Sequence, residues 1–358
     1  MSYYGEPSLS KILIVRLSAA GDVIQTTPIA RQIRRQHPDC HLAWVIERKA
    51  LPGIAHNPHV DEIVTIDSPE PRAWLAAIRR LRKRFDIVVD AQCLLKSGLL
   101  TRLTAAPVRI GRQDARGGSR RCYTRLMPTH MNQTYISQQY LEQCADLGLD
   151  VDDYVPELHL AADDHQRAAA LWQELGLEGR KPVVALIAFS AEPTREWSAD
   201  RFAQVGDLLS ERVGATCLVP GSKAEVSRAE ALIARMQCRP RSLAGRTTLG
   251  EAAALLSRCD LAIGADTGLI HYSLALGVPL VCLLGPSPLR NGPKADTAVT
   301  LASPCKFRHC QPAEKCKRGE GRPCMDEITV EAVVEAAEAL LARGRQPRGA
   351  TQPPATRR

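Results

Sequence analysis

Short apolar runs alternate with amphipathic segments along both halves of this chain of 358 residues. The strand-like runs are Ile12–Val15, Leu42–Ile46, Ile63–Ile66 and Ile87–Val89, then Val183–Phe189, Thr216–Val219, Leu261–Ile263 and Leu280–Leu284. Helical patterns cover Pro28–Gln36, Ala73–Arg84, Asp200–Glu211, Ala224–Met236, Leu249–Ser257 and Ile270–Leu276. This alternation predicts an α/β fold, with parallel sheets that carry helices on both faces.

The length and the punctuation of the chain predict two domains of ordinary size. Pro156 and a helix with an acidic start, Asp163 to Leu175, come before a new strand. We therefore expect one Rossmann-like domain over residues 1–160 and another over 161–343, with a cleft between them as the default binding site. The residues from Gly344 on are rich in Pro, Arg and Thr, which predicts a disordered tail at 344–358.

The sequence shows no feature of a membrane-spanning or exported chain. No apolar run reaches the length that crosses a bilayer. The first ten residues lack a charged segment followed by an apolar one, as a signal peptide would have. The expected location is the cytoplasm.

The segment from Gly264 to His271, Gly-Ala-Asp-Thr-Gly-Leu-Ile-His, predicts an anion site. It joins a buried strand to a helix, and the free N–H groups and positive dipole end of a helix attract phosphate. Thr267 adds a hydroxyl and His271 a ring N–H, while Gly268 lets the backbone approach a ligand closely. A second strand, which ends in Gly285-Pro286-Ser287, completes a βαβ unit.

The first strand leads into a turn of small residues with one carboxylate, Asp22. The dinucleotide pattern G-x-G-x-x-G is absent here. A carboxylate at the end of the strand can act as a general base, or it can cap the next helix. The motif alone favours neither.

Two further residues in the second half each allow a functional and a structural interpretation. Arg195 follows the first strand of that half, where it would neutralise a leaving phosphate or pair with Glu192 or Glu196. Glu225 lies in a helical first turn after Gly221, where it would hold ribose hydroxyls or favour the helix dipole.

The charge of the chain is uneven. Residues 1–150 hold 21 Lys and Arg against 14 Asp and Glu, a surplus of 7. Arginines concentrate between 109 and 125, with only Asp114 among them, at positions Arg109, Arg112, Arg116, Arg120, Arg121 and Arg125. Such a segment suits an anionic partner, or it is a solvated loop. No nucleic-acid-binding signature accompanies it.

Four of the 12 cysteines cluster near the C-terminus, at Cys305, Cys310, Cys316 and Cys324. Their spacing lacks the paired C-x2-C of zinc knuckles, so free thiols come first and a metal site second. The scattered ones, such as Cys217, Cys259 and Cys282, are expected to pack as small core residues.

Taken together, these residues resemble glycosyltransferase family 9, the heptosyltransferases of the lipopolysaccharide inner core. The resemblance covers roughly residues 11–340. Four segments carry it: 11–28 with Gly21-Asp22-Val23-Ile24, Trp44–Glu47 with 56–61, Asp90–Ser97, and Asp266-Thr267-Gly268 with His271 and Gly285-Pro286.

The resemblance implies a GT-B fold, in which two Rossmann-like domains face each other across a cleft. It implies an inverting, metal-independent transfer of L-glycero-D-manno-heptose from ADP-heptose to the Kdo and inner-core region, without a cofactor. Asp22 would be the general base, and the donor would lie on Arg195, Glu225, Asp266, Thr267, Gly268 and His271. Residues 1–160 would bind the acceptor and 161–343 the nucleotide sugar.

The expected acceptor is Kdo–lipid A or inner-core lipopolysaccharide at the cytoplasmic face of the inner membrane, with peripheral association. Lys96, Arg112, Arg116, Arg120 and Arg121 would bind it. The segments around Trp44 and Lys96 look most like the enzymes that add the first heptose to Kdo. Cys93, where a Gly is usual, and residues 130–148 depart from that subgroup, so the acceptor sugar stays open.

Three alternatives remain beside a heptosyltransferase. One is a related transferase with another donor or acceptor. Another is a catalytically silent protein that binds nucleotide or lipid A, against which the presence of Asp22 argues. The last is a zinc-dependent nucleic-acid binder that uses the clustered cysteines and the basic face.

Overall fold

The computed structural model describes residues 10–67, 70–128, 134–306, 316 and 323–344. It divides into unit 1, residues 1–159, and unit 2, residues 160–358. Apart from Gly344, the tail expected at 344–358 lies outside the described residues. Among the described helices, none combines the length and the hydropathy that crossing a membrane requires.

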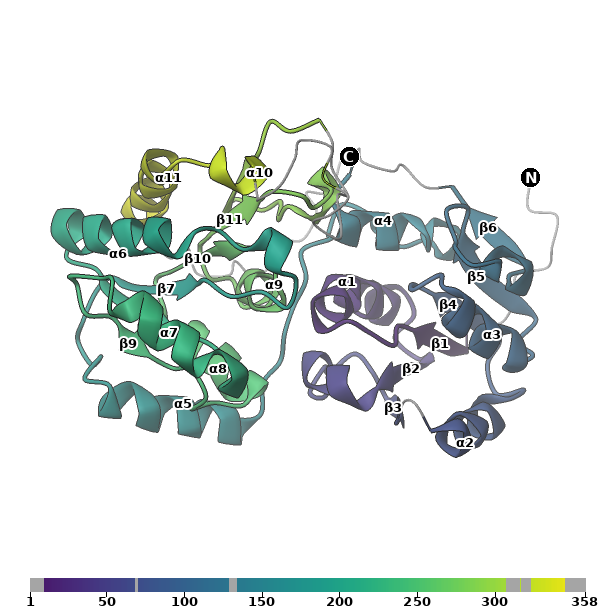
Figure 1. Ribbon diagram of the computed structural model, residues 1–358. Coiled ribbons are helices and arrows are strands. Elements are labelled where there is room, and N and C mark those ends of the chain that lie inside the picture. The colour runs from purple at the N-terminus through teal and green to yellow at the C-terminus, as the bar shows by residue number, and fades with distance from the viewer. Residues whose placement is uncertain (1–9, 68–69, 129–133, 307–315, 317–322, 345–358) are drawn as a thin grey trace, which may run out of the picture. The chain divides into compact units, whose positions relative to one another are not determined.

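Unit 1 holds one sheet of six parallel strands, in the order β3-β2-β1-β4-β5-β6 (Figure 1). Its strands are β1 (Lys11–Val15), β2 (His41–Glu47), β3 (Glu62–Ile66), β4 (Ile87–Asp90), β5 (Val108–Arg112) and β6 (Arg125–Met127). Its helices are α1 (Ala20–Gln36), α2 (Pro71–Leu81), α3 (Leu95–Leu103) and α4 (Ile136–Glu142). Short 3-10 turns are η1 (Arg48–Gly53), η2 (Ser119–Cys122) and η3 (Ala145–Leu147).

Unit 2 holds a second sheet of six parallel strands, in the order β12-β11-β10-β7-β8-β9. Its strands are β7 (Val183–Ile187), β8 (Thr216–Val219), β9 (Arg241–Ser242), β10 (Leu261–Ala265), β11 (Leu280–Leu284) and β12 (Ala298–Ala302). Its helices are α5 (Ala162–Glu174), α6 (Ala199–Val213), α7 (Val226–Ile233), α8 (Leu249–Leu256), α9 (Gly268–Ala275), α10 (Pro323–Asp326) and α11 (Val330–Arg343). The 3-10 turns are η4 (Pro193–Arg195), η5 (Lys223–Glu225) and η6 (Leu289–Asn291).

Both sheets have the strand order of the Rossmann fold, 3-2-1-4-5-6 when each unit is counted from its own first strand. The order reverses between β1 and β4 in unit 1 and between β7 and β10 in unit 2. Open α/β sheets bind ligands at this switch point, outside the carboxyl ends of the strands. The loops after β1, β4, β7 and β10 are therefore where each unit is built to hold a ligand.

The central strands are apolar throughout because helices cover both faces. Every residue of β7, β10 and β11 is buried. On one face of the second sheet, α6 and α11 lie side by side (Figure 1) and bury Phe202, Leu209, Val333 and Leu340. This packing holds β7 and β10 in place, and with them the loops that follow these two strands.

The start of α1 differs from the sequence expectation: the helix begins at Ala20, not at Pro28. Pro28 has no N–H to bond the carbonyl of Ile24 one turn earlier. The hydroxyl of Thr27 donates to that carbonyl at 2.8 Å instead. Because this bond replaces the missing one, α1 continues through the proline, and Asp22 lies inside its first turn.

Candidate active site

At the switch point of unit 2, three side chains meet around the buried carboxylate of Asp266. His271 Nε2 lies 2.9 Å from Oδ1, while Arg195 Nη1 and Asn291 Nδ2 donate to Oδ2 at 3.2 and 3.1 Å. Arg195 also donates to the Asp266 carbonyl at 3.1 Å. The structure thus brings together Arg195, Asp266 and His271, which lie on η4, after β10 and on α9.

Burial would raise the pKa of Asp266, but His271, Arg195 and Ser287 hold that pKa well below its usual range. Asp266 is therefore ionised at neutral pH. An ionised carboxylate accepts hydrogen bonds only, so Nε2 of His271 carries the proton in this pair. The carboxylate fixes the ring orientation of His271 and the position of Arg195.

A pocket of about 290 Å³ opens beside this cluster. Strand ends and helix starts line it, among them Ser190, Gly221, Glu225, Thr248, Thr267 and Gly268. Thr267 Oγ1 is buried, and no described residue gives it a hydrogen-bond partner. A Cβ added to Gly268 would meet no heavy atom within 4 Å, since that side of the backbone is open. A hydroxyl without a partner and an open helix start are suited to an anionic ligand.

Glu225 lies at the same pocket and also has a structural contact. Its Oε2 accepts a hydrogen bond from the backbone N–H of Ser222 at 2.6 Å, in a capping box. The two interpretations of this residue are therefore compatible. The carboxylate is held in place by the turn and lines the pocket.

Sequence reasoning missed Arg290, on η6 next to Asn291. Its Nε and Nη1 are buried, and the described residues provide no hydrogen-bond partner for either atom. Two unsatisfied guanidinium donors beside the Asp266 cluster are unusual, because buried polar groups are normally paired. A signal was present in the sequence, since Arg290 closely follows the Gly285-Pro286 pair after β11.

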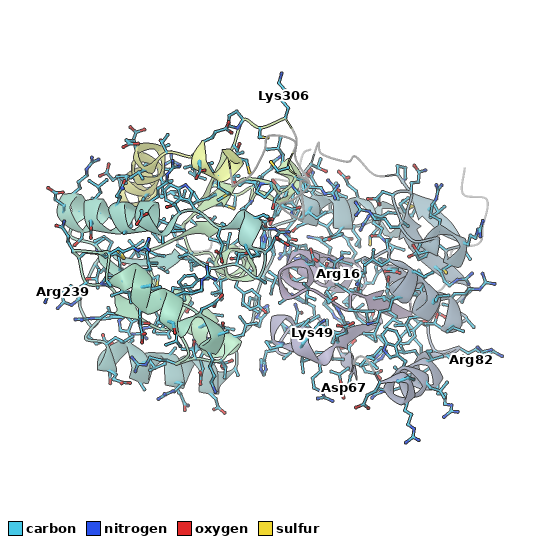
Figure 2. The ribbon with its side chains drawn as sticks, in the orientation of Figure 1. Arg16, Lys49, Asp67, Arg82, Arg239 and Lys306 are labelled. Carbon is cyan, nitrogen blue, oxygen red and sulfur yellow. The ribbon has the colours of Figure 1, made fainter. Side chains whose placement is uncertain are left out.

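At the switch point of unit 1, Asp22 is paired with Arg16. Arg16 Nη2 lies 2.6 Å from Asp22 Oδ2, and Arg16 Nη1 donates to the carbonyl of Ala91 at 2.8 Å. Arg16 is only 4% exposed and stacks on Tyr140, 5.1 Å from the ring centre. Figure 2 shows Arg16 within the body of unit 1, whereas Arg82 extends away from it. Directly after β1, the guanidinium of Arg16 is thus held in a fixed position against the Asp22 carboxylate.

Asp22 is not the N-cap of α1, which is Ala19. It lies three residues further on and accepts a long hydrogen bond, 3.3 Å, from the Ala19 backbone N–H. Its side chain remains 44% exposed. Asp22 therefore combines a fixed orientation with access from solvent, as a general base requires.

The loop after β4 contains Cys93, at a position where related sequences usually have a Gly, and its backbone shows why a Gly is favoured there. Asp90 is fully buried and accepts hydrogen bonds from the N–H groups of Gln92 and Cys93 and from the Tyr123 hydroxyl. This tight turn places Cys93 at a φ of 55°, in the left-handed region that favours glycine. Burial raises the pKa of the Cys93 thiol to about 12, which keeps it protonated.

The five basic residues expected to bind an acceptor differ in their surroundings. Arg112 is buried and donates to Asp114 Oδ1 and to the Ala91 carbonyl. Lys96 is bonded to Glu47 at 2.5 Å and lies over the ring of Trp74. The other three are exposed, on or just before η2: Arg116, Arg120 and Arg121. Arg112 is therefore enclosed, and its contacts support the loop around Ala91, whereas the three exposed arginines reach solvent.

Three of the four clustered cysteines are described, and Cys310 lies outside the described residues. Burial raises the pKa of Cys324, and Cys305 and Cys316 raise it further. Among the described residues, these three cysteines do not form a group whose ligand atoms all lie within 4.8 Å of one another. Among the scattered cysteines, Cys217, Cys259 and Cys282 are buried in unit 2.

Comparisons with known proteins give the family. The model described as "Glycosyltransferase family 9 (heptosyltransferase)" matches residues 74–318. Lipopolysaccharide heptosyltransferase 1 of Pseudomonas aeruginosa is 28% identical over 365 residues, covering 92% of this chain and 98% of that protein.

Two solved structures show the fold. A family 9 glycosyltransferase from Veillonella parvula has a TM-score of 0.79 at 24% identity, over 95% of this chain and 99% of that one. The E. coli heptosyltransferase WaaC with ADP-2-deoxy-2-fluoro heptose has a TM-score of 0.68 at 22% identity, over 92% and 99%. The expected GT-B class, with two Rossmann-like parallel sheets, is confirmed. This chain belongs to glycosyltransferase family 9 and is a glycosyltransferase.

Proposed function

We propose that this enzyme transfers L-glycero-D-manno-heptose from ADP-heptose to the Kdo and inner-core region of lipopolysaccharide, with inversion at the anomeric carbon. The family description names heptosyltransferases, and WaaC, which has the same fold, binds an ADP-heptose analogue. The observation that carries the donor assignment is the pocket at the unit 2 switch point, with its unpartnered Thr267 hydroxyl.

Unit 2 binds the donor in this proposal. The diphosphate lies at the start of α9, against Thr267 and the backbone N–H groups that follow Gly268. Arg195, oriented by Asp266, and Arg290 supply positive charge, and His271 holds Asp266 in place through its Nε2–H. Glu225 reaches the ribose hydroxyls from the pocket wall. These protein donors take the place of a metal ion.

Unit 1 binds the acceptor and supplies the base. Asp22 takes the proton of the acceptor hydroxyl while that oxygen attacks the anomeric carbon. The bond from this carbon to the ADP oxygen breaks on the opposite face, and ADP leaves with its electron pair. Arg16 is a positioning residue, since it holds the carboxylate of Asp22 at 2.6 Å and is itself fixed by Ala91 and Tyr140.

One surface of unit 1 supports a lipid-linked acceptor and peripheral contact with the inner membrane at its cytoplasmic face. Leu95, Leu99 and Leu103 are each more than 40% exposed and lie four residues apart, on one face of α3. Exposed arginines, Arg116, Arg120 and Arg121, lie on η2 and the loop before it, which packs against α3. Apolar and basic side chains together suit lipid chains and anionic head groups.

Binding calorimetry with a set of nucleotides and nucleotide sugars tests the donor. We expect ADP-heptose and ADP to bind with micromolar affinity and UDP- and GDP-sugars to bind at least tenfold more weakly. Preference for a UDP- or GDP-sugar would assign the enzyme to another donor class within the family. Binding of no nucleotide at all would contradict the assignment of the pocket.

A further inference from the structure

Outside the candidate active site, unit 1 brings together two histidines and a glutamate from distant parts of the chain. His59 lies between η1 and β3, while Glu157 and His159 lie on the segment before α5. His159 is the last residue of unit 1, and the chain enters unit 2 at Leu160. The three side chains each offer one ligand atom, and these atoms lie within 4.8 Å of one another.

The two imidazoles converge on a single carboxylate oxygen. His59 Nε2 lies 3.1 Å and His159 Nε2 3.5 Å from Glu157 Oε1. The His159 nitrogen is buried, and no described residue forms a hydrogen bond with it. Metal ligands at 2.0–2.1 Å in a tetrahedral zinc site are about 3.3 Å apart along each edge. The two N–O distances match that edge.

Neighbouring residues hold the carboxylate in the orientation that a metal ligand needs. Arg31 Nη1 donates to Oε2 at 3.2 Å, which leaves Oε1 toward the imidazoles, and Asn57 Nδ2 lies 3.4 Å from Oε1. The positive charge of Arg31 is offset by Asp153 at 2.8 Å, so it does not by itself repel a cation.

We propose that His59, Glu157 and His159 bind a divalent transition-metal ion of the Zn²⁺ type, with one position left for water. Two neutral imidazoles and one carboxylate are a common ligand set for such ions. The ion would fasten the segment that leaves unit 1 to the turn before β3. It would stabilise unit 1 and take no part in the transfer, because Asp22 is not among its ligands.

The test is a cobalt titration of the full chain after removal of metal by a chelator. We expect one Co²⁺ bound through nitrogen and oxygen, with visible d–d bands, and Zn²⁺ should displace it. The variants His59→Gln and His159→Gln should each weaken this binding at least tenfold. Zn²⁺ should raise the melting temperature of the wild type by several degrees more than that of His159→Gln, since a ligand stabilises the state it binds.

Two controls separate this site from other metal binding. His41→Gln should leave the titration unchanged, because the nitrogens of His41 face two different carboxylates, Glu62 at 3.2 Å and Asp61 at 3.9 Å. Cys324→Ser should remove any thiolate-to-cobalt charge-transfer band and leave the nitrogen-and-oxygen bands. No uptake of Co²⁺ or Zn²⁺, or uptake that is the same in His59→Gln and His159→Gln, would overturn the proposal.

Discussion

Arg16 and Asp22, at the end of β1 and in the first turn of α1, form an ion pair of 2.6 Å in which only the carboxylate reaches solvent. The guanidinium is enclosed by the Ala91 carbonyl and the ring of Tyr140. In unit 2, Asp266 is enclosed in the same way, but there the cation and the histidine surround the carboxylate. At one switch point the carboxylate is open to solvent, and at the other it is enclosed by the groups that it orients.

Thr267→Val should weaken the binding of ADP while leaving the free energy of unfolding almost unchanged. The Thr267 hydroxyl has no partner among the described residues, so its loss should leave the free energy of unfolding unchanged or raise it by up to about 1 kcal/mol. Valine also suits the extended backbone of this residue, at a φ of −134°. If the hydroxyl bonds a phosphate, the Kd for ADP should rise roughly tenfold, about 1.4 kcal/mol. Calorimetry and urea unfolding check both effects, and unchanged ADP affinity would remove Thr267 from the donor site.

Gly268→Ala should fold normally and bind the donor poorly. The added Cβ meets no heavy atom within 4 Å, but Gly268 lines the pocket. We expect the KM for ADP-heptose to rise roughly tenfold while the melting temperature stays the same or increases, because alanine favours the helix by up to about 1 kcal/mol.

Gly264→Ala is the matched variant. Its Cβ would lie 2.6 Å from the Ile187 carbonyl oxygen, so it should lower the free energy of unfolding by about 1–3 kcal/mol. An unaltered KM in Gly268→Ala would place the donor elsewhere.

Arg195→Ala should lower turnover and donor affinity together. The substitution removes one of the groups that orient Asp266, and with it the cation that the proposed function assigns to the donor phosphates. We expect kcat/KM to fall roughly 10- to 100-fold, about 1.4–2.7 kcal/mol. Arg235→Ala, which breaks the exposed pair with Asp200, should leave steady-state kinetics unchanged. Kinetics of Arg195→Ala equal to those of Arg235→Ala would reduce Arg195 to a structural role.

The stability of unit 1 should depend on pH through Glu62. Hydrogen bonds from Arg84, Arg80 and His41 lower the pKa of Glu62 to about 2, although its partial burial alone would raise that pKa. A carboxylate with a lowered pKa stabilises the fold above its unfolded pKa of about 4.3 and loses that effect as pH falls toward 2.

Glu62→Gln should therefore cost about 1 kcal/mol at pH 7, a small value because Arg80 and Arg84 are 57% and 41% exposed. The difference from the wild type should shrink at pH 3, as urea unfolding at the two pH values would show. A constant difference would mean that the charge of Glu62 is not responsible.

The central strands and the loops that follow them were predictable, since buried parallel strands are continuous apolar runs. The sequence alone was enough to predict the strands Val183–Ile187 and Leu280–Leu284, without knowing which strands pair with them. The edge strand Glu62–Ile66 was predicted as well, whereas Val108–Arg112 and Ala298–Ala302 were missed. Two further edge strands were missed because they are very short, Arg241–Ser242 and Arg125–Met127. They exist only through pairing with the strand beside them.

Pairings between distant residues could not be predicted. Asp22 and Asp266 were identified from local motifs, but the stacking of Arg16 on Tyr140, the enclosure of Arg112 and the contact of Asn291 with Asp266 depend on the folded chain. The same is true of His59 and Glu157, which lie 98 positions apart in the sequence. Sequence motifs located the strand ends, and the sheet order determined which of them meet.

The most direct test of the account is ADP release by the purified enzyme, given ADP-heptose and Kdo₂–lipid A, for the wild type, Asp22→Asn and Asp67→Asn. Asp67 pairs with Arg48 in unit 1, and its side chain is 47% exposed against 44% for Asp22, so it controls for loss of an ion pair. Asp22→Asn will also lower stability, because buried Arg16 loses its partner, so its fold and its ADP-heptose affinity are measured alongside. We predict turnover by the wild type and Asp67→Asn, and at least a hundredfold loss in a folded Asp22→Asn that still binds the donor. Normal turnover by Asp22→Asn would contradict the assignment of Asp22 as the base.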